Sequence, residues 1–560
     1  MKRSHWLPVA LCASAMGITA ACSIAAGSAD SGAGGGAGSD GGAFGAGGGG
    51  AENGSGQGGS GNGKNIVEPG ADTGGAGGGL TATVTTTTTT RPSGSGGEGG
   101  GSGGSGGAGD TTSTTEISCA QDMGAPRIFY MSSDDSNSMG SPALAREFLQ
   151  AGQAPPPALI RPYEFLNYYR IRYDPLPSDG LLDVWVSYAP AADDGKYRLQ
   201  VGVQSFTVGR PKMSLTFVVD TSSSLIGEGI ERERAAVEAI ASKLVSGDRV
   251  SFVVWANEDA VLLEDHAVSG PDDPELLAVA AGLAPGGGSD LHSGLTHGYA
   301  LAEQTATKDR LSRVVLLSDG GANLGIVDRT LIAEKAKKGD DQGIYLVGVG
   351  VGPAQGYSDA LMNAVTDEGR GAYVYVDSVA EATAVLGGRF DEVMDIAARA
   401  VEVKLTLPSY FGIESTSAEQ VSTDKEAVTP QHLAPGDSMT FYQVLGLAKN
   451  TEVCGDDKVG VEVKWQAPAL HPAIGGKTFA SWPMTIKDIE GETWQMRKAE
   501  AIVAYANALL TRNKSDFAKA VEAVTIAKDD PELLAADDHS AELLEIADLL
   551  EQFPEAEKVP

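Results

Sequence analysis

The stretch Leu215-Thr-Phe-Val-Val-Asp-Thr-Ser-Ser-Ser224 decides the fold, because an apolar run ends there in the carboxylate of Asp220. Hydroxyls follow at Ser222 and Ser224. A short, branched apolar run bounded by polar residues is typical of a strand buried in a parallel sheet. Short oxygen-bearing side chains suit a hard divalent cation, since Mg²⁺ takes about six oxygen ligands. We therefore expect a buried strand that ends in a cation site.

Two later segments supply the same kind of chemistry. Pro285-Gly-Gly-Gly-Ser289 places a hydroxyl on a glycine-rich loop just before a helical pattern. Arg313-Val-Val-Leu-Leu-Ser-Asp-Gly320 repeats the first pattern, an apolar strand followed by an acid. In a parallel sheet the carboxyl ends of the strands lie at one edge, where ligands bind. The sequence thus predicts one metal site made of Asp220, Ser222, Ser224, Ser289 and Asp319.

This set resembles the metal-ion-dependent adhesion site of von Willebrand factor type A domains, with its pattern Asp-x-Ser-x-Ser, then Thr, then Asp. The resemblance covers roughly residues 211 to 390. Ser289 stands where the family has Thr, which keeps the oxygen but loses a methyl that helps to fix the rotamer. The resemblance implies a bound Mg²⁺ or Mn²⁺ whose shell is completed by an acidic side chain of a protein ligand. The alternative is that Ser222 and Ser224 only cap the next helix.

Strand and helix patterns alternate from residue 213 onward. This alternation predicts an α/β fold, a doubly wound and mostly parallel Rossmann-like sheet. Strands are expected at 215–219, 250–255, 314–317, 344–349 and 372–376, with a short edge strand at 260–263. Helices are expected at 230–244, 295–305, 330–337, 358–366 and 380–386.

In the regions on both sides of this domain, the apolar residues repeat with a different spacing. Period-two segments at 183–188, 197–203, 401–407, 439–444 and 459–465 predict antiparallel strands, which we expect to form one flanking β-sandwich. From Glu492 the period becomes helical, so a small helical hairpin is expected at the C-terminus. The expected domains are 1–22 (signal peptide), 23–117 (tether), 118–210 (N-terminal flank, partly β), 211–395 (α/β domain), 396–488 (β-rich flank) and 489–560 (helical region).

The N-terminus has the features of an export signal. A basic start and a short apolar core up to Ala21 fit a signal peptide, and the core is too short for a permanent membrane span. Thr19-Ala-Ala-Cys22 is similar to the lipobox of bacterial lipoproteins, which implies lipidation of Cys22. Plain secretion after cleavage near Ala21 is the alternative. Ser23, rather than an acid, follows Cys22, which resembles the outer-membrane sorting signal of enteric-type bacteria. We therefore expect a location in the cell envelope. Residues 23–117 are expected to form a flexible Gly/Ser/Thr-rich tether.

Cysteine content and charge limit the partners. After Cys22, only Cys119 and Cys454 remain, and an exported compartment permits a disulfide between them, with two unpaired thiols as the alternative. The formal net charge of −33 argues against nucleic acid and against an anionic membrane surface, which both require clustered Lys and Arg. Membrane contact is therefore expected through the lipid anchor only.

Enzymatic function finds little support in the sequence. His292 and His297 are five residues apart, which does not place them on one helix face. No Gly-x-Ser-x-Gly turn follows a strand, and no glycine-rich loop carries the Lys-Ser/Thr of a phosphate site. We expect a non-enzymatic, membrane-tethered protein that binds a protein ligand through a cation. A scaffold with a structural or inactive metal site, and less favourably a hydrolase, remain as alternatives.

Overall fold

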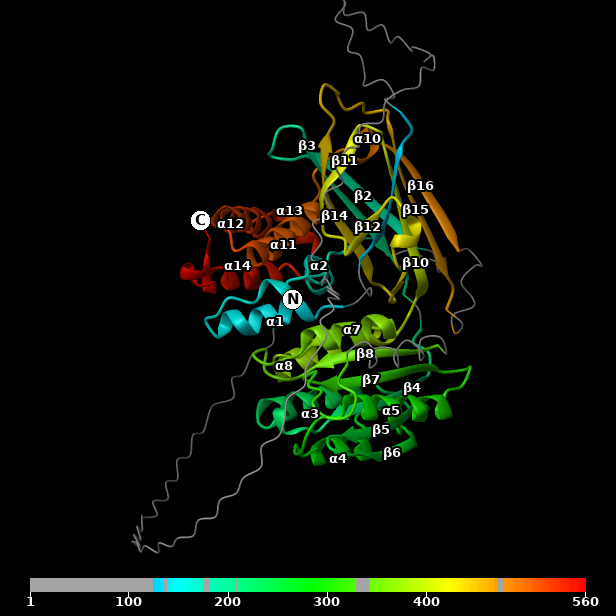
Figure 1. Ribbon diagram of the computed structural model, residues 1–560. Helices are drawn as coiled ribbons and strands as arrows, with labels where there is room; N and C mark the ends of the chain where they lie inside the picture. Colours follow the sequence, from blue (N-terminus) through cyan, green and yellow to red (C-terminus); the bar gives the residue numbers. More distant parts are fainter. Residues whose placement is uncertain are drawn as a thin grey trace, which may run out of the picture. The chain divides into compact units, whose positions relative to one another are not determined.

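The residues described in the computed structural model form three β-sheets and several groups of helices (Figure 1). They are residues 124–133, 138–174, 182–207, 209–328, 343–468, 470 and 478–559. The expected signal peptide and tether, with Cys22 and Cys119, lie outside them. No helix in the described part of the chain is long and apolar enough to cross a membrane.

The central sheet has the strand order β6-β5-β4-β7-β8-β9, and β6 is the one antiparallel strand in it. The predicted doubly wound, mostly parallel sheet is therefore confirmed, and so is the edge strand near residues 260–263. The strands of the central sheet are β4 (Met213–Asp220), β5 (Arg249–Trp255), β6 (Asp259–Ala267), β7 (Leu311–Ser318), β8 (Ile344–Gly350) and β9 (Tyr373–Tyr375).

Helices cover both faces of this sheet, which explains why β4, β7 and β8 are almost wholly buried. Phe217 and Val219 pack on the helices of one face, and Val218 packs on those of the other. A Cβ on Gly298 would lie 2.2 Å from Val218 Cγ2, so glycine lets α5 approach the sheet closely. One face carries α3 (Glu228–Ala241), α4 (Pro274–Gly282), α8 (Val379–Ala382), η3 (Thr383–Gly388) and α9 (Phe390–Met394), the other α5 (Leu291–Thr305) and α7 (Asp359–Gly369). The helix expected at 330–337 lies outside the described residues.

The flanking strands form two antiparallel sheets around one apolar core, which confirms the predicted sandwich. One sheet has the order β12-β1-β10-β15-β16, with β13 paired to β10, and the other has the order β11-β14-β3-β2. Strands from both sides of the α/β domain pair directly, β1 with β10 and β3 with β14. The bounds are β1 (Arg127–Ser132), β2 (Asp183–Pro190), β3 (Lys196–Gln204), β10 (Ala398–Leu407), β11 (Phe411–Thr416), β12 (Gln420–Ser422), β13 (Gln431–Leu433), β14 (Ser438–Leu447), β15 (Lys458–Gln466) and β16 (Phe479–Thr485).

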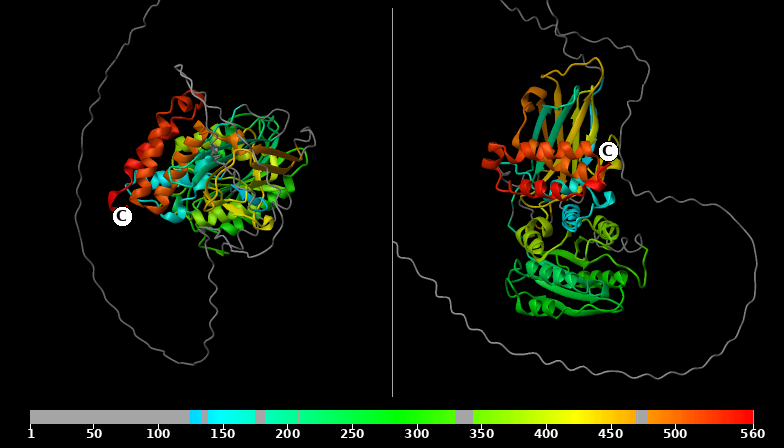
Figure 2. Two further views of the ribbon diagram at one scale, coloured as in Figure 1. Left: turned by 90° about the horizontal axis from the view of Figure 1, so that it is seen from above. Right: turned by 90° about the vertical axis from the view of Figure 1, so that its left-hand side faces the viewer.

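The C-terminal helical region is larger than the hairpin that the sequence pattern predicted. Figure 2 shows its helices beside the two helices of the N-terminal flank. Its apolar face packs against them, as in the contact between Phe165 and Tyr505, whose ring centroids lie 5.4 Å apart. The flank helices thereby bury their own apolar residues. The helices are α1 (Gly140–Gln150), α2 (Pro162–Tyr168), α11 (Trp494–Thr511), α12 (Lys514–Lys528), α13 (Pro531–Ala536) and α14 (Glu542–Gln552). The described residues also contain short helical turns at α10 (Ile486–Ile489), η1 (Pro157–Leu159), η2 (Ser223–Leu225), η4 (Lys425–Ala427) and η5 (Glu555–Glu557).

Arg146 on α1 joins three parts of the chain. Its guanidinium lies 2.6 Å from Asp377, 2.7 Å from Glu381 on α8 and 2.9 Å from Glu545 on α14. Planar guanidinium groups suit such multiple carboxylate contacts, because their donors point in fixed directions. The α/β domain is thus linked to the helices α1 and α14 through partly buried ion pairs.

Candidate metal site

The predicted site residues lie on loops at the carboxyl end of the central sheet. Asp220 is the last residue of β4, and Asp319 directly follows the last residue of β7. These two strands are paired in parallel, with Val219 opposite Leu317, so both acids leave the sheet at the same edge. Ser222 and Ser224 begin the connection to α3, and Ser289 precedes α5.

A hydrogen-bond network holds the Asp220 carboxylate. The backbone N–H of Ser222 donates to Oδ1 at 2.8 Å, and the Ser318 hydroxyl donates to Oδ2 at 2.7 Å. The hydroxyl oxygens of Ser222 and Ser224 lie 2.9 Å apart. Ser222 is buried whereas Ser224 is exposed, so the cluster reaches solvent on the side of Ser224.

The turn after β7 connects Asp319 to Ser289. The backbone N–H of Gly321 donates to Asp319 Oδ1 at 2.8 Å, and the Ser289 hydroxyl donates to the Gly321 carbonyl. The Ser289 N–H donates to Asn323 Oδ1 at 2.9 Å, while its carbonyl accepts from the N–H of Asn323 at 3.0 Å. These bonds fix the Ser289 side chain although it lacks the methyl of Thr. Its hydroxyl proton is used by the carbonyl, which leaves oxygen lone pairs for a cation.

Two glycines let the backbone pack tightly around Asp319. Gly320 has a φ of +73°, and a Cβ there would lie 2.7 Å from the carbonyl oxygen of Ser358. A Cβ on Gly352 would lie 2.4 Å from the Asp319 Cβ. Side chains at either position would therefore displace the turn or the acid itself.

The site brings two buried carboxylates together. Asp220 is fully buried and Asp319 is 7 % exposed. Burial and the neighbouring charge of Asp319 raise the pKa of Asp220 to about 7. In the described part of the chain neither acid forms an ion pair. A divalent cation would neutralise this pair, so the electrostatics fit a metal ion.

The donor types point to a hard ion. Carboxylate and hydroxyl oxygens are ligands that Mg²⁺ and Mn²⁺ accept, whereas zinc sites usually include His nitrogen or Cys sulfur. Among the described residues, no group of three or more His, Cys, Asp or Glu side chains could hold a metal ion. Any ion at this edge would therefore depend on the serine hydroxyls as well as on the two acids.

Sequence reasoning missed two residues that support the site. Ser318 donates to Asp220, and Asn323 holds the Ser289 loop. Ser318 could have been noticed, because it is a lone hydroxyl at the polar end of an apolar strand next to Asp319. Nothing in the local sequence marks Asn323, since its contact depends on how two distant loops meet.

His297, near the glycine-rich loop, is partnered by an acid. His297 hydrogen-bonds Asp259 on β6, and the Ser293 hydroxyl donates to the other oxygen of Asp259 at 2.9 Å. The acid therefore stands between the imidazole and the hydroxyl. A nucleophilic serine requires the base itself as its partner.

Residues 214–386 match the von Willebrand factor type A domain, a family of adhesion and ligand-binding domains, so the chain contains a domain of this class. The chain is similar to the protein YfbK of Escherichia coli (strain K12), with 27 % identity over 306 residues that cover 52 % of each chain. It is also similar to the inter-alpha-trypsin inhibitor heavy chain H3 of Bos taurus, with 24 % identity over 41 % of this chain and 26 % of that protein. The chain thus spans about half or less of the length of these relatives.

Among solved structures, a von Willebrand factor type A protein from Catenulispora acidiphila is similar to this chain at 11 % sequence identity and a TM-score of 0.41. The match covers 62 % of this chain and 86 % of that one.

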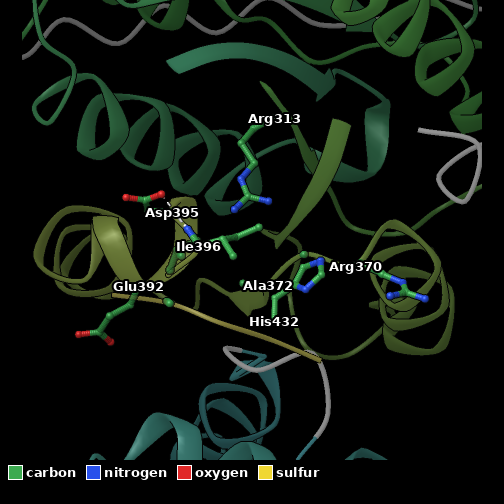
Figure 3. Close-up of a pocket in the computed structure, with 10 residues that line it drawn as sticks. Arg313, Arg370, Ala372, Glu392, Asp395, Ile396 and His432 are labelled. Atoms are coloured by element: carbon green, nitrogen blue, oxygen red, sulfur yellow. Dashed lines mark hydrogen bonds between the residues drawn. The ribbon is translucent and has the colours of Figure 1, made fainter. Parts of the chain in front are cut away.

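A second polar cluster lies between the α/β domain and β13 (Figure 3). Arg313 and His432 line a cavity of about 20 Å³, room for roughly one water molecule. The backbone N–H of Ala400 donates to His432 Nδ1 at 3.2 Å, which assigns the ring proton to Nε2. Burial and the charges of neighbouring arginines, Arg313 first, lower the pKa of His432 to about 3. The cavity is too small for a metabolite. Burial and the arginine charges keep the His432 ring neutral at pH 7.

This neutral histidine predicts a specific acid sensitivity. In the unfolded chain His432 takes up a proton near pH 6.5, whereas in the folded protein it does so only near pH 3. The unfolded state therefore binds more protons between these values, and folding stability falls as the pH decreases from 6.5 toward 3. An Asn in place of His432 keeps an acceptor for the N–H of Ala400. This replacement should reduce the slope of the unfolding free energy against pH by up to about 1.4 kcal/mol per pH unit. Urea unfolding of wild type and His432→Asn at pH 7, 6, 5 and 4 measures this slope. Equal slopes for the two proteins would contradict the prediction.

Proposed function

We propose that this protein binds a protein ligand through a divalent cation, Mg²⁺ or Mn²⁺, at the carboxyl end of its central sheet. The residues that would hold the ion are Asp220, Ser222, Ser224, Ser289 and Asp319. The main support is the buried pair of carboxylates, uncompensated by any cation among the described residues and next to hydroxyls that reach solvent. The class of the domain adds to this support.

The hydroxyls would bind the ion directly, and the acids would balance its charge directly or through water. Neutral hydroxyl ligands leave much of the charge of the ion uncompensated, so an incoming carboxylate is held strongly. The solvent side of the cluster, at Ser224, is where an acidic side chain of the ligand would complete the shell. The role proposed here is binding rather than catalysis.

We further propose that the chain is exported and is held at the cell envelope by a lipid on Cys22. Metabolic labelling with a palmitate analogue tests this. The wild-type chain should carry the label and Cys22→Ser should not. Labelling of neither chain would favour secretion.

Cys454 is buried and disulfide-bonded. Cys119 lies outside the described residues, and we propose it as the partner of Cys454. Peptide mapping without reduction should recover a peptide that joins both cysteines. Recovery of Cys119 as a free thiol would exclude this pairing.

The binding role is tested by capture from an envelope extract with Ser222→Ala and Ser214→Ala as matched variants. Both serines are buried on or next to β4, but Ser214 lies at its other end. Wild type and Ser214→Ala should capture the same protein in Mn²⁺ and release it with EDTA, and an acidic peptide should compete. Ser222→Ala should capture at least tenfold less. Capture that ignores EDTA would favour the scaffold alternative, in which the flanking domains make the contacts.

A further inference from the structure

Two buried hydrogen-bond donors belong to side chains that line one small cavity. The cavity has a volume of about 20 Å³, and its lining includes Arg313 of β7 and His432 of β13 (Figure 3). Arg313 Nη1 and His432 Nε2 are both buried, and among the described residues neither atom has a hydrogen-bond partner. The Ala400 N–H donates to Nδ1 of the ring at 3.2 Å, so Nε2 carries the ring proton. Two unused N–H groups thus line the same cavity.

The Arg313 guanidinium is a buried positive charge without an ionic partner. The residue is 2 % exposed, its Nε donates to the Met394 carbonyl at 2.8 Å, and its Cζ lies 5.2 Å from the centre of the Tyr345 ring. In the described part of the chain, Arg313 forms no ion pair. Burial lowers the pKa of Arg313 to about 10, more than Tyr345 and Asp395 raise it, so the group is still charged at pH 7. A buried, unpaired charge is costly, so this one requires an explanation.

The two acids that line the cavity are engaged with other groups. Glu392 is paired with Arg389. Asp395 Oδ1 accepts from the backbone N–H of the next residue at 2.8 Å, a bond that Figure 3 marks with a dashed line. The charges that act on the His432 ring are those of arginines, Arg313 first. The electric potential at this ring is therefore positive, which favours a negative ion beside it.

We propose that the cavity binds one chloride ion, held by Arg313 Nη1 and His432 Nε2. A chloride ion accepts hydrogen bonds from both donors, and it supplies the negative charge that the guanidinium lacks. A water molecule would accept the same two hydrogen bonds but leave the guanidinium charge unpaired. An organic anion does not fit, because the cavity has room for about one particle of the size of water.

The ion would join two parts of the chain. Arg313 belongs to the central sheet, and His432 belongs to β13, which pairs with β10 of the sandwich. Met394, which accepts from Arg313, is the last residue of α9, shortly before β10 begins. A chloride ion would therefore hold the α/β domain to the sandwich beside one of the connections between them. Folding stability would then depend on the concentration of chloride and not only on ionic strength.

Thermal unfolding of the full chain tests the site, with sodium gluconate replacing sodium chloride so that the ionic strength stays constant. EDTA is present throughout, so the result does not depend on the proposed metal site. Chloride at 100 mM should raise the melting temperature of wild type by about 3 °C, and the rise should saturate. Arg313→Met should show no such rise. The control is Arg249→Met, which should respond as wild type does, because Arg249 at the start of β5 is already paired with Asp265 at 2.5 Å.

Bromide scatters anomalously and allows a direct test that needs no variant. Wild-type crystals grown in sodium bromide should show an anomalous peak within hydrogen-bond distance of Arg313 Nη1 and His432 Nε2. A water molecule in the cavity, together with no saturable effect of chloride, would overturn the proposal. Equal chloride responses of wild type and Arg313→Met would overturn it too. A bromide peak seen only at molar concentration, without any effect of chloride in solution, would mean an adventitious ion only and would also overturn it. If Arg313→Met does not fold, the anomalous peak and the chloride response of wild type decide.

Discussion

Replacing Asp220 with Asn should weaken Mg²⁺ and Mn²⁺ binding at least a hundredfold, about 3 kcal/mol, while the metal-free domain stays at least as stable as wild type. The affinity falls because one of the two balancing charges is lost. The stability holds because Asp220 is buried beside Asp319, and burial and that like charge raise its pKa to about 7. An Asn can still accept from the N–H of Ser222. Calorimetry and urea unfolding in EDTA measure the two quantities.

The matched control is Asp248→Asn at the opposite end of the same sheet. Asp248 is also fully buried, but it pairs with Arg210 at 2.6 Å and accepts from the N–H of Met213 at 3.0 Å. Its replacement should cost about 2 to 4 kcal/mol of folding stability and leave the metal affinity unchanged. Equal metal affinities for wild type and Asp220→Asn would show that the site is not where we place it.

Replacing Lys498 with Met should destabilise the helical region by about 3 to 5 kcal/mol, because it leaves buried acids without their cation. The Lys498 ammonium is fully buried and lies 2.7 Å from Asp537 and 2.9 Å from Glu542. It also donates to the carbonyl of Arg170 at 2.6 Å, which joins α11 to the N-terminal flank. Urea unfolding followed by circular dichroism at 222 nm measures the loss.

Lys487 provides the control for this experiment. It pairs with Asp456 on the surface, where both side chains are more than half exposed. Lys487→Met should change stability by less than about 1 kcal/mol, since exposed ion pairs contribute little. Adding Asp537→Leu to Lys498→Met should restore part of the lost stability, because the unpaired charge is removed. Equal losses for the two lysines would contradict a buried, structural role for Lys498.

The central sheet and the arrangement of the five site residues were accessible from the sequence for one physical reason. Buried parallel strands need apolar runs, and parallel strands end at a common edge, so Asp220 and Asp319 could be assigned to one place before any coordinates. Ser289 could be assigned to the same edge because it lies on a glycine-rich loop just before a helical pattern. The metal itself remains a proposal.

The remaining features depend on contacts between distant parts of the chain. The packing of α2 on α11 buries Phe165 against Tyr505, but neither residue carries a local sign of its partner. Glu233 looks like one more charged residue of an amphipathic helix, within Glu-Arg-Glu-Arg234. Only the direction in which the helix faces the sheet shows that this acid is buried while Glu231 and Glu238 are exposed.

The insertion of the α/β domain between β3 and β10 has a mechanical consequence. Two covalent connections leave the domain for the same sandwich, so a load applied to the domain is divided between two polypeptide segments. A single proteolytic nick in either segment would leave the domain attached by the other. Separation of the α/β domain from the sandwich therefore requires two independent cuts.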